Sequence, residues 1–586
     1  MQKFLSCIKK KYATIALLAI ILVAFFVRFY KFDEWLYFKM DQSRDALLIS
    51  RAVNDGPGYL PLLGARAGST KLKHGFLRLG PIFYYFQYLS GKIFNSTEPY
   101  VFAYPDLFFS ILAIPTLYLI SRLYFSRRYS LMITAMYAFS FIIIQYSRFS
   151  WNPNALQFFL LLAFYGLLKM LNEPDEKKRK WWIAIWATGA VIGSQLHFFG
   201  FFSLMGISGL LIIFHFKLWN GTEIKACFKE KLFKKIIVYA GIIVLVFLIF
   251  YIPVIISDSR KNFQNSKNFI EAIGSKPANK PLSDKIQKGI TENLKYYCLI
   301  TTSQCYENGH MQKEWPAVVL TGVILLGGFI LIIRFLKKEI SPLKKDFLLL
   351  LLTWIGIFFI ITIPVSFQLR PRFFIVVFAV PFIFMGLIFN YLEEKFGKKT
   401  ALPMALFLTA GIIGWNSHGT YQWFKEQEKS QKSAFAVKRT LILKNKDGVT
   451  LGELQRVADY IYAHRKTGAT IYYYVKPEHV RPIDYLLLQK QNKSLKFSNM
   501  KLNGDPQAQF FAITPAKSEL TPVIKKFKEA ITIISSEQVG QLKVWEIAFP
   551  NRVINSNFKF KATAGEKDRL YWKDVFGIKM KKNIKQ

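Results

Sequence analysis

Two carboxylates, Asp41 and Asp45, stand four residues apart just beyond the first long hydrophobic stretch of the chain. Residues with this spacing share one face of a helix, so a helix here presents both acids together. A carboxylate in lipid costs free energy, on the order of 2.5–3.5 kcal/mol at mid-bilayer and less toward the interface. Paired carboxylates perform acid–base chemistry such as glycoside hydrolysis. This helix at a membrane boundary is therefore the first candidate for a chemical site.

The composition is that of a membrane protein that crosses the bilayer many times. Of 586 residues, 52% are hydrophobic, 56 are Phe, and the apolar residues come in long blocks. The net charge of +42 would suggest nucleic-acid binding in a soluble domain. Here much of the Lys and Arg stands in short clusters between apolar blocks, which is typical of loops that set membrane orientation. This pattern argues against a nucleic-acid partner.

Apolar runs of roughly 20 residues predict about eleven transmembrane helices. The first run follows Lys9 to Lys11 and lacks the small-residue cleavage signature of a signal peptide, so we interpret it as a retained signal anchor. An odd number of spans puts the two termini on opposite sides of the membrane. The predicted spans are 14–30, 100–124, 129–147, 154–171, 181–197, 199–216, 236–257, 315–335, 346–365, 372–392 and 401–416.

The basic clusters orient this map. All of them fall on one side, which the positive-inside rule makes cytoplasmic, in a plasma (inner) membrane. The N-terminus is then cytoplasmic, and segments 31–99 and 258–313 and everything after about 417 are extracytoplasmic. The clusters are Lys9 to Lys11, Arg127-Arg128, Lys177 to Lys180, Lys231 with Lys234-Lys235, Lys337-Lys338 with Lys344-Lys345, and Lys398-Lys399.

The four cysteines agree with this orientation. Cys298 and Cys305 both lie in the long external loop, whereas Cys7 and Cys227 fall on the cytoplasmic side. We predict a disulfide between Cys298 and Cys305. Two unpaired thiols are the alternative, because spacing alone does not define disulfide geometry.

The character of the chain changes after Gly419, where long apolar runs stop. We divide it into a transmembrane domain, 1–417, and an extracytoplasmic α/β domain, 418–586. The last part, 551–586, is basic with scattered aromatics and either contacts an anionic lipid or polymer or is a solvated tail. Periodicity predicts helices at 451–465 and 482–489 and strands at 469–475, 509–513, 530–535 and 542–549.

The first external segment, 31–99, carries more than the two acids. The Gly- and Pro-rich stretch 54–64 separates two short amphipathic helices that we expect to lie along the interface, with the Tyr/Phe cluster of 80–86 in the headgroup zone. The sequence has no Gly-rich phosphate loop, no Cys-x-x-Cys pair and no His-Glu-x-x-His motif. An enzyme working on the outer face without a nucleotide site would take its donor from a lipid carrier.

Five segments of the chain resemble bacterial membrane glycosyltransferases of family 39. Members have the GT-C fold and are akin to protein O-mannosyltransferases and the lipid A aminoarabinose transferase. The resemblance covers about residues 10–400 and implies an all-helical GT-C core with interfacial helices in the first external loop. The segments are DQSRDALLISRAV (41–53), LPLLGARAGS (60–69), HGFLRLGPIFYYF (74–86), YSRFSWNPNALQFF (146–159) and QLHFF (195–199).

The resemblance implies a hexosyl- or pentosyltransferase. Such an enzyme moves a sugar from a polyprenyl-phosphate donor to a glycan, lipid or protein acceptor on the extracytoplasmic face, with inversion. Asp41 matches the essential Asp of the family. Gln42 stands where many relatives have Glu, so the resemblance implies no role for a second acid there. Asn154 stands where relatives often have Asp, and this departure argues against a metal site. We assign no metal ligands and no certain cofactor, and the sequence leaves open whether a divalent cation takes part.

The chemistry needs a base and a partner for the leaving phosphate. A carboxylate that takes the acceptor proton contributes about 10²–10⁴-fold, and we predict that Asp41 is this base. A helix cap or a salt bridge to Arg44 is the structural alternative. Arg370 and Arg372, at the entrance of the tenth span, are candidates for stabilising the phosphate, with snorkelling to headgroups as their alternative.

Further substrate contacts are expected in the same region, each with a structural alternative. Asp45 alternatively pairs with an Arg, Arg148 with Asp41 or Asp45, and the His and Tyr side chains alternatively anchor the membrane interface. The candidates are Asp45, Arg44, His74, Tyr84, Tyr85, Arg148, Asn154 and His197.

Two other classes of function compete with the enzyme. A lipid-linked sugar flippase or exporter would also need a charged, lipid-facing cavity, but we find neither polar residues along the spans nor inverted repeats. A non-catalytic assembly protein of the cell envelope would owe its role to the external domain. The sequence does not identify the sugar or the acceptor.

Overall fold

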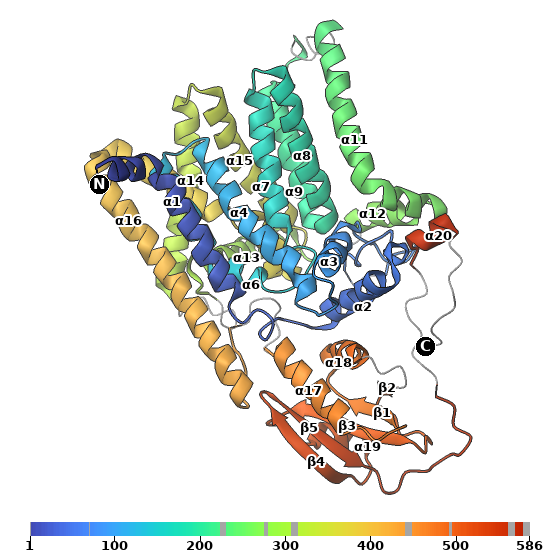
Figure 1. The fold of residues 1–586 in the computed structure, drawn as a ribbon. Coiled ribbons are helices and arrows are strands. Elements are labelled where there is room, and N and C mark those ends of the chain that lie inside the picture. Colours follow the sequence, from blue (N-terminus) through green and yellow to red (C-terminus); the bar gives the residue numbers. More distant parts are fainter. Residues whose placement is uncertain are drawn as a thin grey trace.

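The computed structural model describes residues 2–68, 71–222, 230–274, 279–305, 314–439, 448–490, 495–560 and 569–577. The main body is a bundle of long helices, and a small α/β domain lies beyond one end of it (Figure 1). The predicted fold class, a helical membrane core with a small C-terminal sheet domain, is confirmed.

The bundle contains a helix at nearly every predicted span. Seven helices in the described part of the chain are long and apolar enough to cross a membrane: α1, α4, α9, α11, α14, α15 and α16. The bundle helices are α1 (Gln2–Phe29), α4 (Tyr104–Arg122), α5 (Arg127–Ala138), α6 (Phe141–Tyr146), α7 (Leu156–Asn172), α8 (Glu176–Leu196), α9 (Phe198–His215), α11 (Glu230–Arg260), α14 (Trp315–Lys338), α15 (Pro342–Thr362) and α16 (Val380–Lys432).

Three of the predicted spans differ in detail from the structure. The span predicted at 129–147 is two short helices, α5 and α6, separated at Phe139 and Ser140. The span predicted at 372–392 begins as a 3₁₀-helix, η5 (Pro371–Val377), before α16. The spans predicted at 372–392 and 401–416 share α16, which is kinked at Gly397 with φ 72° and ψ 163°. A positive φ is easily adopted only by glycine, so Gly397 permits the break.

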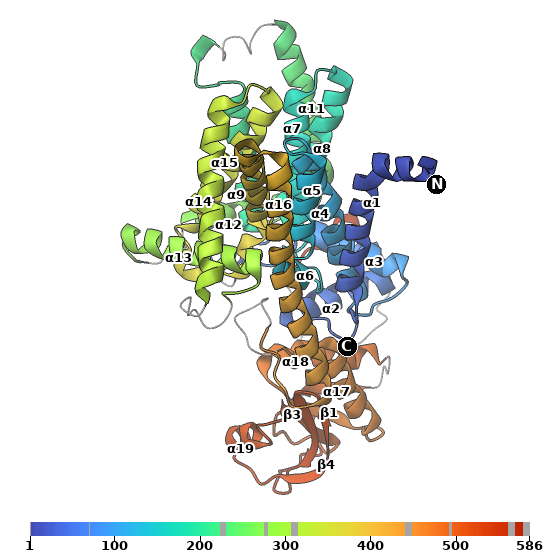
Figure 2. The ribbon, with the colours of Figure 1, turned by 90° about the vertical axis from the view of Figure 1, so that its left-hand side faces the viewer.

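The second half of α16 connects the bundle to the α/β domain. It runs past the predicted domain boundary at 417–418 and ends at Lys432. Figures 1 and 2 show it descending along the bundle from the end near the N-terminus. At that end lie the connections between α4 and α5, α7 and α8, and α14 and α15, which carry the basic clusters. The sheet domain lies at the other end.

The segment between α1 and α4 forms a platform at the end of the bundle that faces the sheet domain (Figure 1). It contains α2 (Met40–Asp55), η1 (Pro57–Tyr59) and α3 (Ile82–Ile93). Helix α2 begins where Gln42 Oε1 accepts a hydrogen bond from the Lys39 amide at 3.2 Å and ends at Gly56, whose φ is 105°. Its apolar side, including Ile49 and Ala52, is buried in the core. These are the two interfacial helices that the sequence predicts.

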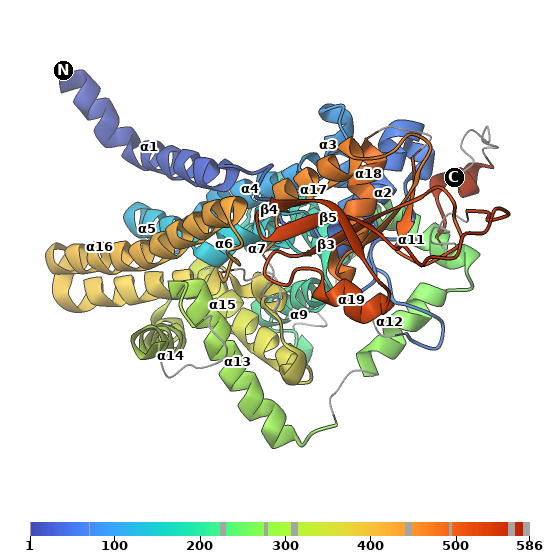
Figure 3. The same ribbon diagram turned by 90° about the horizontal axis from the view of Figure 1, so that it is seen from below.

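The C-terminal domain is a five-stranded mixed sheet with the order β2-β1-β3-β5-β4. Strand β1 is parallel to β2 and β3, and β5 is antiparallel to β3 and β4. Figure 3 views this sheet from below the bundle. Its elements are α17 (Leu451–Ala463), β1 (Thr470–Tyr474), α18 (Pro477–Gln489), β2 (Lys496–Asn499), β3 (Ala508–Pro515), α19 (Thr521–Phe527), β4 (Thr532–Val539) and β5 (Leu542–Ala548).

The long segment between α11 and α14 contains α12 (Gln264–Gly274) and α13 (Leu282–Thr302). Cys298 and Cys305 form a disulfide with an S–S distance of 2.08 Å. Both cysteines are buried against Ala317 and Val318, so the bond ties the residues just after α13 back to that helix and packs against the start of α14. The side chains of Cys7 and Cys227 lie outside the described residues.

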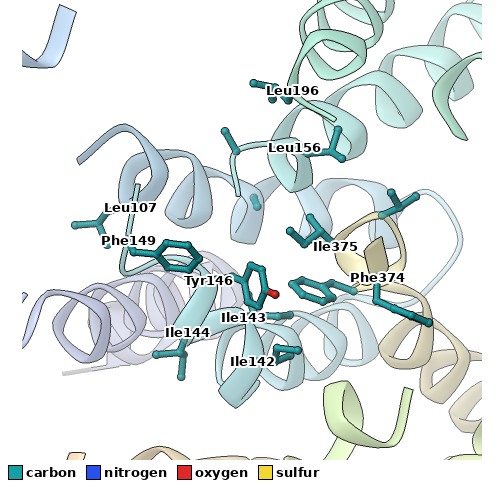
Figure 4. Packing of buried hydrophobic residues seen from close by; sticks show 14 of the residues in the cluster. Leu107, Ile142, Ile143, Ile144, Tyr146, Phe149, Leu156, Leu196, Phe374 and Ile375 are labelled. Atoms are coloured by element: carbon teal, nitrogen blue, oxygen red, sulfur yellow. The ribbon is translucent and has the colours of Figure 1, made fainter. Parts of the chain in front are cut away.

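Buried aromatic and aliphatic side chains pack together where α6 meets η5. Figure 4 shows Tyr146 and Phe149 packed beside Phe374 and Ile375. The rings of Tyr146 and Phe149 are 5.7 Å apart between centres. Because these residues are almost fully buried, the start of η5, with Arg370 and Arg372, is held at a defined place.

Candidate active site

Helix α2 places its two carboxylates in opposite environments. The Asp41 side chain is 53% exposed, whereas that of Asp45 is 3% exposed. Arg44 lies between them: its Nη1 donates to Asp41 Oδ1 at 3.0 Å, and its Nε donates to Asp45 Oδ1 at 2.8 Å. Burial lowers the pKa of Arg44, but the charges of Asp45, Tyr84 and Asp41 raise it above its ordinary value. Arg44 therefore stays a cation that orients both acids.

Asp45 is held from the other side by helix α3. The hydroxyl of the fully buried Tyr84 donates to Asp45 Oδ1 at 2.8 Å. Burial first, and then the Asp45 charge, raise the pKa of Tyr84 to about 12, against the lowering effect of Arg569 and Arg44. Asp45 thus joins α2 to α3. Its pairing with Arg44 is the structural alternative to substrate contact that the sequence left open.

A residue from the far C-terminus reaches the same cluster. The Arg569 guanidinium carbon lies 5.7 Å from the ring centre of Tyr84, and the Arg569 side chain hydrogen-bonds to Tyr84. Trp572 Nε1 donates to the Tyr85 hydroxyl at 2.9 Å, and that hydroxyl donates to the Pro61 carbonyl at 3.2 Å. Sequence reasoning missed both residues. The only signal for them is the run Arg569-Leu-Tyr-Trp-Lys573, which is too aromatic for a solvated tail.

The start of η5 carries two arginines close to Asp41 or to one another. Arg370 directly precedes η5, and Arg372 is its second residue. Arg372 lies close enough to Asp41 and Arg370 for their charges to act on it. Its guanidinium carbon stands 5.2 Å from the ring centre of Trp151. The structure therefore brings an exposed acid near cations that come from a distant part of the chain.

His197 lies on the Arg372 side of this region. Its Nδ1 accepts a hydrogen bond from the Phe199 amide at 3.2 Å, so it caps the N-terminus of α9. Its ring centre is 5.7 Å from that of Phe373, and the charge of Arg372 acts on it. His74, in contrast, is exposed in a turn, and its carbonyl accepts a hydrogen bond from the Gln264 side chain.

Arg148 and Asn154 have structural contacts instead. The buried Arg148 donates to the carbonyls of Arg28 at 2.6 Å and Tyr30 at 2.8 Å, at the end of α1. A cation that satisfies the last carbonyls of a helix stabilises it. The structure pairs Arg148 with the end of α1 rather than with Asp41 or Asp45, one of the alternatives from the sequence, because both of its terminal nitrogens donate to carbonyls there. Asn154 Nδ2 donates to the Phe149 carbonyl at 2.8 Å and stabilises the turn before α7.

We expect Arg148→Met to lower the free energy of unfolding by about 2–4 kcal/mol, because it leaves the carbonyls at the end of α1 without donors. Thermal unfolding of the purified chain in detergent measures this loss, with Arg128→Met, on an exposed side chain, as the control. Unchanged stability combined with weaker donor binding would instead make Arg148 a substrate contact.

A second buried acid near the site was not singled out from the sequence. Asp106 of α4 is fully buried, and its Oδ2 accepts a hydrogen bond from the Trp151 amide at 3.1 Å. It thereby holds the turn that carries Trp151 beneath Arg372. The described residues contain no group of three or more His, Cys, Asp or Glu side chains that could hold a metal ion.

A protein-family model matches about a third of the chain. Residues 67–257 match the family model described as dolichyl-phosphate-mannose-protein mannosyltransferase. The matched stretch begins after α2 and extends into α11, so Asp41 and Asp45 lie outside it. No protein of curated function matches the chain by sequence.

Solved structures have a similar fold at low sequence identity. ArnT from Cupriavidus metallidurans in the apo state is 12% identical with a TM-score of 0.52, covering 91% of this chain and 97% of ArnT. The same protein bound to undecaprenyl phosphate also scores 0.52 at 12% identity, with coverage of 92% and 98%. An Archaeoglobus fulgidus oligosaccharyltransferase tethered to an acceptor peptide is 15% identical, scores 0.50, and is matched over 88% of this chain and 70% of its own.

These structural matches show that the chain has the fold of the GT-C membrane glycosyltransferases. The resemblance to glycosyltransferase family 39 that the sequence motifs suggest is confirmed, with the mannosyltransferase match at residues 67–257 as its most specific part.

Proposed function

We propose that this chain is a glycosyltransferase that moves a sugar from a polyprenyl-phosphate donor to an acceptor hydroxyl of a glycan, lipid or protein. The GT-C fold and the family match at residues 67–257 support this class of reaction. The bound undecaprenyl phosphate of the ArnT structure supports a donor of this chemistry. Because the basic clusters lie at the opposite end of the bundle, the end with α2 and the sheet domain faces away from the cytoplasm.

The proposed reaction is a single displacement with inversion. The acceptor oxygen forms a bond to the anomeric carbon and gives its proton to Asp41. The bond between the anomeric carbon and the phosphate oxygen breaks, and its electron pair leaves with the polyprenyl phosphate. The observation that carries this assignment is the exposed Asp41 carboxylate, oriented by Arg44 and close to Arg372.

The contacts of Asp41 suit a base. Arg44 occupies Oδ1, whereas Oδ2 accepts no hydrogen bond from the part of the chain that the structure describes. The hydrogen bond at Oδ1 therefore orients the Asp41 carboxylate, and Oδ2 can accept a proton. Asp45 cannot take the same part, because it is buried and bonded to Arg44 and Tyr84.

Arg372→Gln is expected to lower kcat/KM for the lipid donor by roughly 10- to 100-fold, because a charged hydrogen bond to the leaving phosphate contributes about 1.5–3 kcal/mol. Steady-state kinetics with varied donor concentration measure the change. Arg334→Gln is the control, since Arg334 pairs with Glu394 in a contact between α14 and α16 away from this site. Wild-type kinetics for Arg372→Gln would remove Arg372 from the donor site.

The direct test of the proposed function uses the purified full chain in detergent. It is incubated with polyprenyl-phosphate-linked hexoses and pentoses and with candidate glycan, lipid and peptide acceptors. We expect release of polyprenyl phosphate and a glycosylated product. A flippase would instead move the intact donor across vesicles without releasing phosphate, and an assembly protein would do neither. Either result would overturn the proposal.

A further inference from the structure

The last described segment, Arg569–Gly577, lies against the loop after the candidate base, and we call it the C-terminal strap. It contains the short helix α20 (Trp572–Phe576). Pro61 and Tyr571 form an antiparallel bridge. The Leu62 amide donates to the Leu570 carbonyl at 3.0 Å, and the Trp572 amide donates to the Leu60 carbonyl at 3.1 Å. Backbone pairing of this kind fixes the register of the strap on the platform.

Side chains attach the strap to three further elements. Trp572 donates to Tyr85 of α3, and Lys573 Nζ stands 4.6 Å from the ring centre of Tyr59 in η1. Arg260, at the end of α11, donates to the carbonyl of Asp574 at 2.9 Å. Figure 1 shows α20 beside this side of the bundle, away from the sheet that precedes it in the sequence. The strap is therefore a bound part of the platform.

Arg569 enters the buried cluster from the start of the strap. Its side chain is buried, with the residue 8% exposed. Burying a guanidinium costs much free energy unless polar groups accept its hydrogen bonds. Its neighbour is Tyr84, whose hydroxyl has one proton to give. Because that proton goes to Asp45, the Tyr84 oxygen is left to accept from a donor such as Arg569. The contacts then run from Arg569 through Tyr84, Asp45 and Arg44 to Asp41.

We propose that the C-terminal strap is part of the active site and that Arg569 is a positioning residue, which holds Asp41 in place through Tyr84 and Asp45. This inference rests on the proposed function. Hydrogen bonds arranged in a chain polarise one another, so loss of the first donor weakens the bonds that follow. A small displacement of a catalytic group lowers the rate more than it lowers substrate binding.

The first experiment compares Arg569→Gln with Arg569→Lys in the assay for released polyprenyl phosphate. We expect Arg569→Gln to lower kcat about 10- to 100-fold with the donor KM changed less than about twofold. Arg569→Lys, which keeps a cationic donor, should recover most of the rate. Arg552→Gln is the matched control, because Arg552 also packs on an aromatic ring and donates to a carbonyl, but within the sheet domain.

The second experiment tests the whole strap. A chain that ends at residue 568 should lose at least tenfold in kcat, and a synthetic peptide of residues 569–577 should restore it. A chain that ends at Gly577 is the control and should keep the wild-type rate. Hydrogen exchange gives a readout without activity: the Leu62 amide, protected by Leu570 in the full chain, should exchange faster after truncation.

The outcomes separate this inference from the proposed function. If the wild-type chain releases polyprenyl phosphate and the chain ending at 568 does so equally fast, the strap is not part of the active site. If Arg569→Lys is as slow as Arg569→Gln while both keep wild-type stability, the positioning role of the cation is wrong. If the wild-type chain releases nothing, the proposed function fails, and hydrogen exchange still reports whether the strap binds the platform.

Discussion

Replacing Asp41 by Asn is expected to lower kcat for sugar transfer by about 10²–10⁴-fold. The amide has nearly the shape of the carboxylate and can still face Arg44, but it cannot take the proton of the acceptor hydroxyl. The side chain is more than half exposed, so its replacement should change the free energy of unfolding by less than about 0.5 kcal/mol. The variant therefore separates chemistry from folding.

Release of polyprenyl phosphate and thermal unfolding should be measured on the same preparation. Asp55→Asn is the matched control, because Asp55 is an exposed acid at the other end of α2 that pairs with Arg51. We expect its transfer rate to equal that of the wild type. Transfer at the wild-type rate by Asp41→Asn would show that another group is the base.

Asp45→Asn is expected to lower both the stability of the protein and its rate of transfer. Removing one partner of a buried ion pair typically costs about 3–5 kcal/mol, because the other charge is left buried. Arg44 keeps its contact with Asp41 and is 18% exposed, so we expect a loss near the lower end of that range. Transfer should fall as well, since α2 loses its attachment to Tyr84 of α3.

The double variant Arg44→Met with Asp45→Leu distinguishes support from chemistry. Replacing both members of a buried pair by apolar side chains costs much less than removing one. The double variant should thus unfold at a higher temperature than Asp45→Asn but still transfer slowly, because Asp41 has lost its orienting cation. If Asp45→Asn unfolds like the wild type and yet loses activity, Asp45 contacts the substrate instead.

Much of the helical core could be predicted from short-range patterns. Apolar runs located the bundle helices, and the Gly- and Pro-rich stretch between α2 and α3 located the two platform helices. In the C-terminal domain the strands β1, β3, β4 and β5 and the helices α17 and α18 were predicted, whereas β2 and the short helix α19 were missed. Strand β2 has only four residues, and two of them are exposed, so its sequence carries little hydrophobic alternation.

The difference between the two acids could not be predicted from their spacing. A four-residue interval places both on one face of α2, and only the packing of α3 buries Asp45 while Asp41 stays exposed. The contacts of Arg148 could not be predicted from local sequence either. Its motif made it a candidate for binding substrate, but the end of α1, far away in the sequence, takes its hydrogen bonds.

Local sequence was sufficient to predict the membrane core and the platform and to propose Asp41 as the base, because hydropathy, helix periodicity and the Asp41 motif each depend on neighbouring residues. The tertiary structure alone decided which groups surround that base. Arg372 and Arg569 reach α2 and α3 through packing of η5 and pairing of the C-terminal strap. Such contacts join residues hundreds of positions apart, so no short-range sequence pattern predicts them.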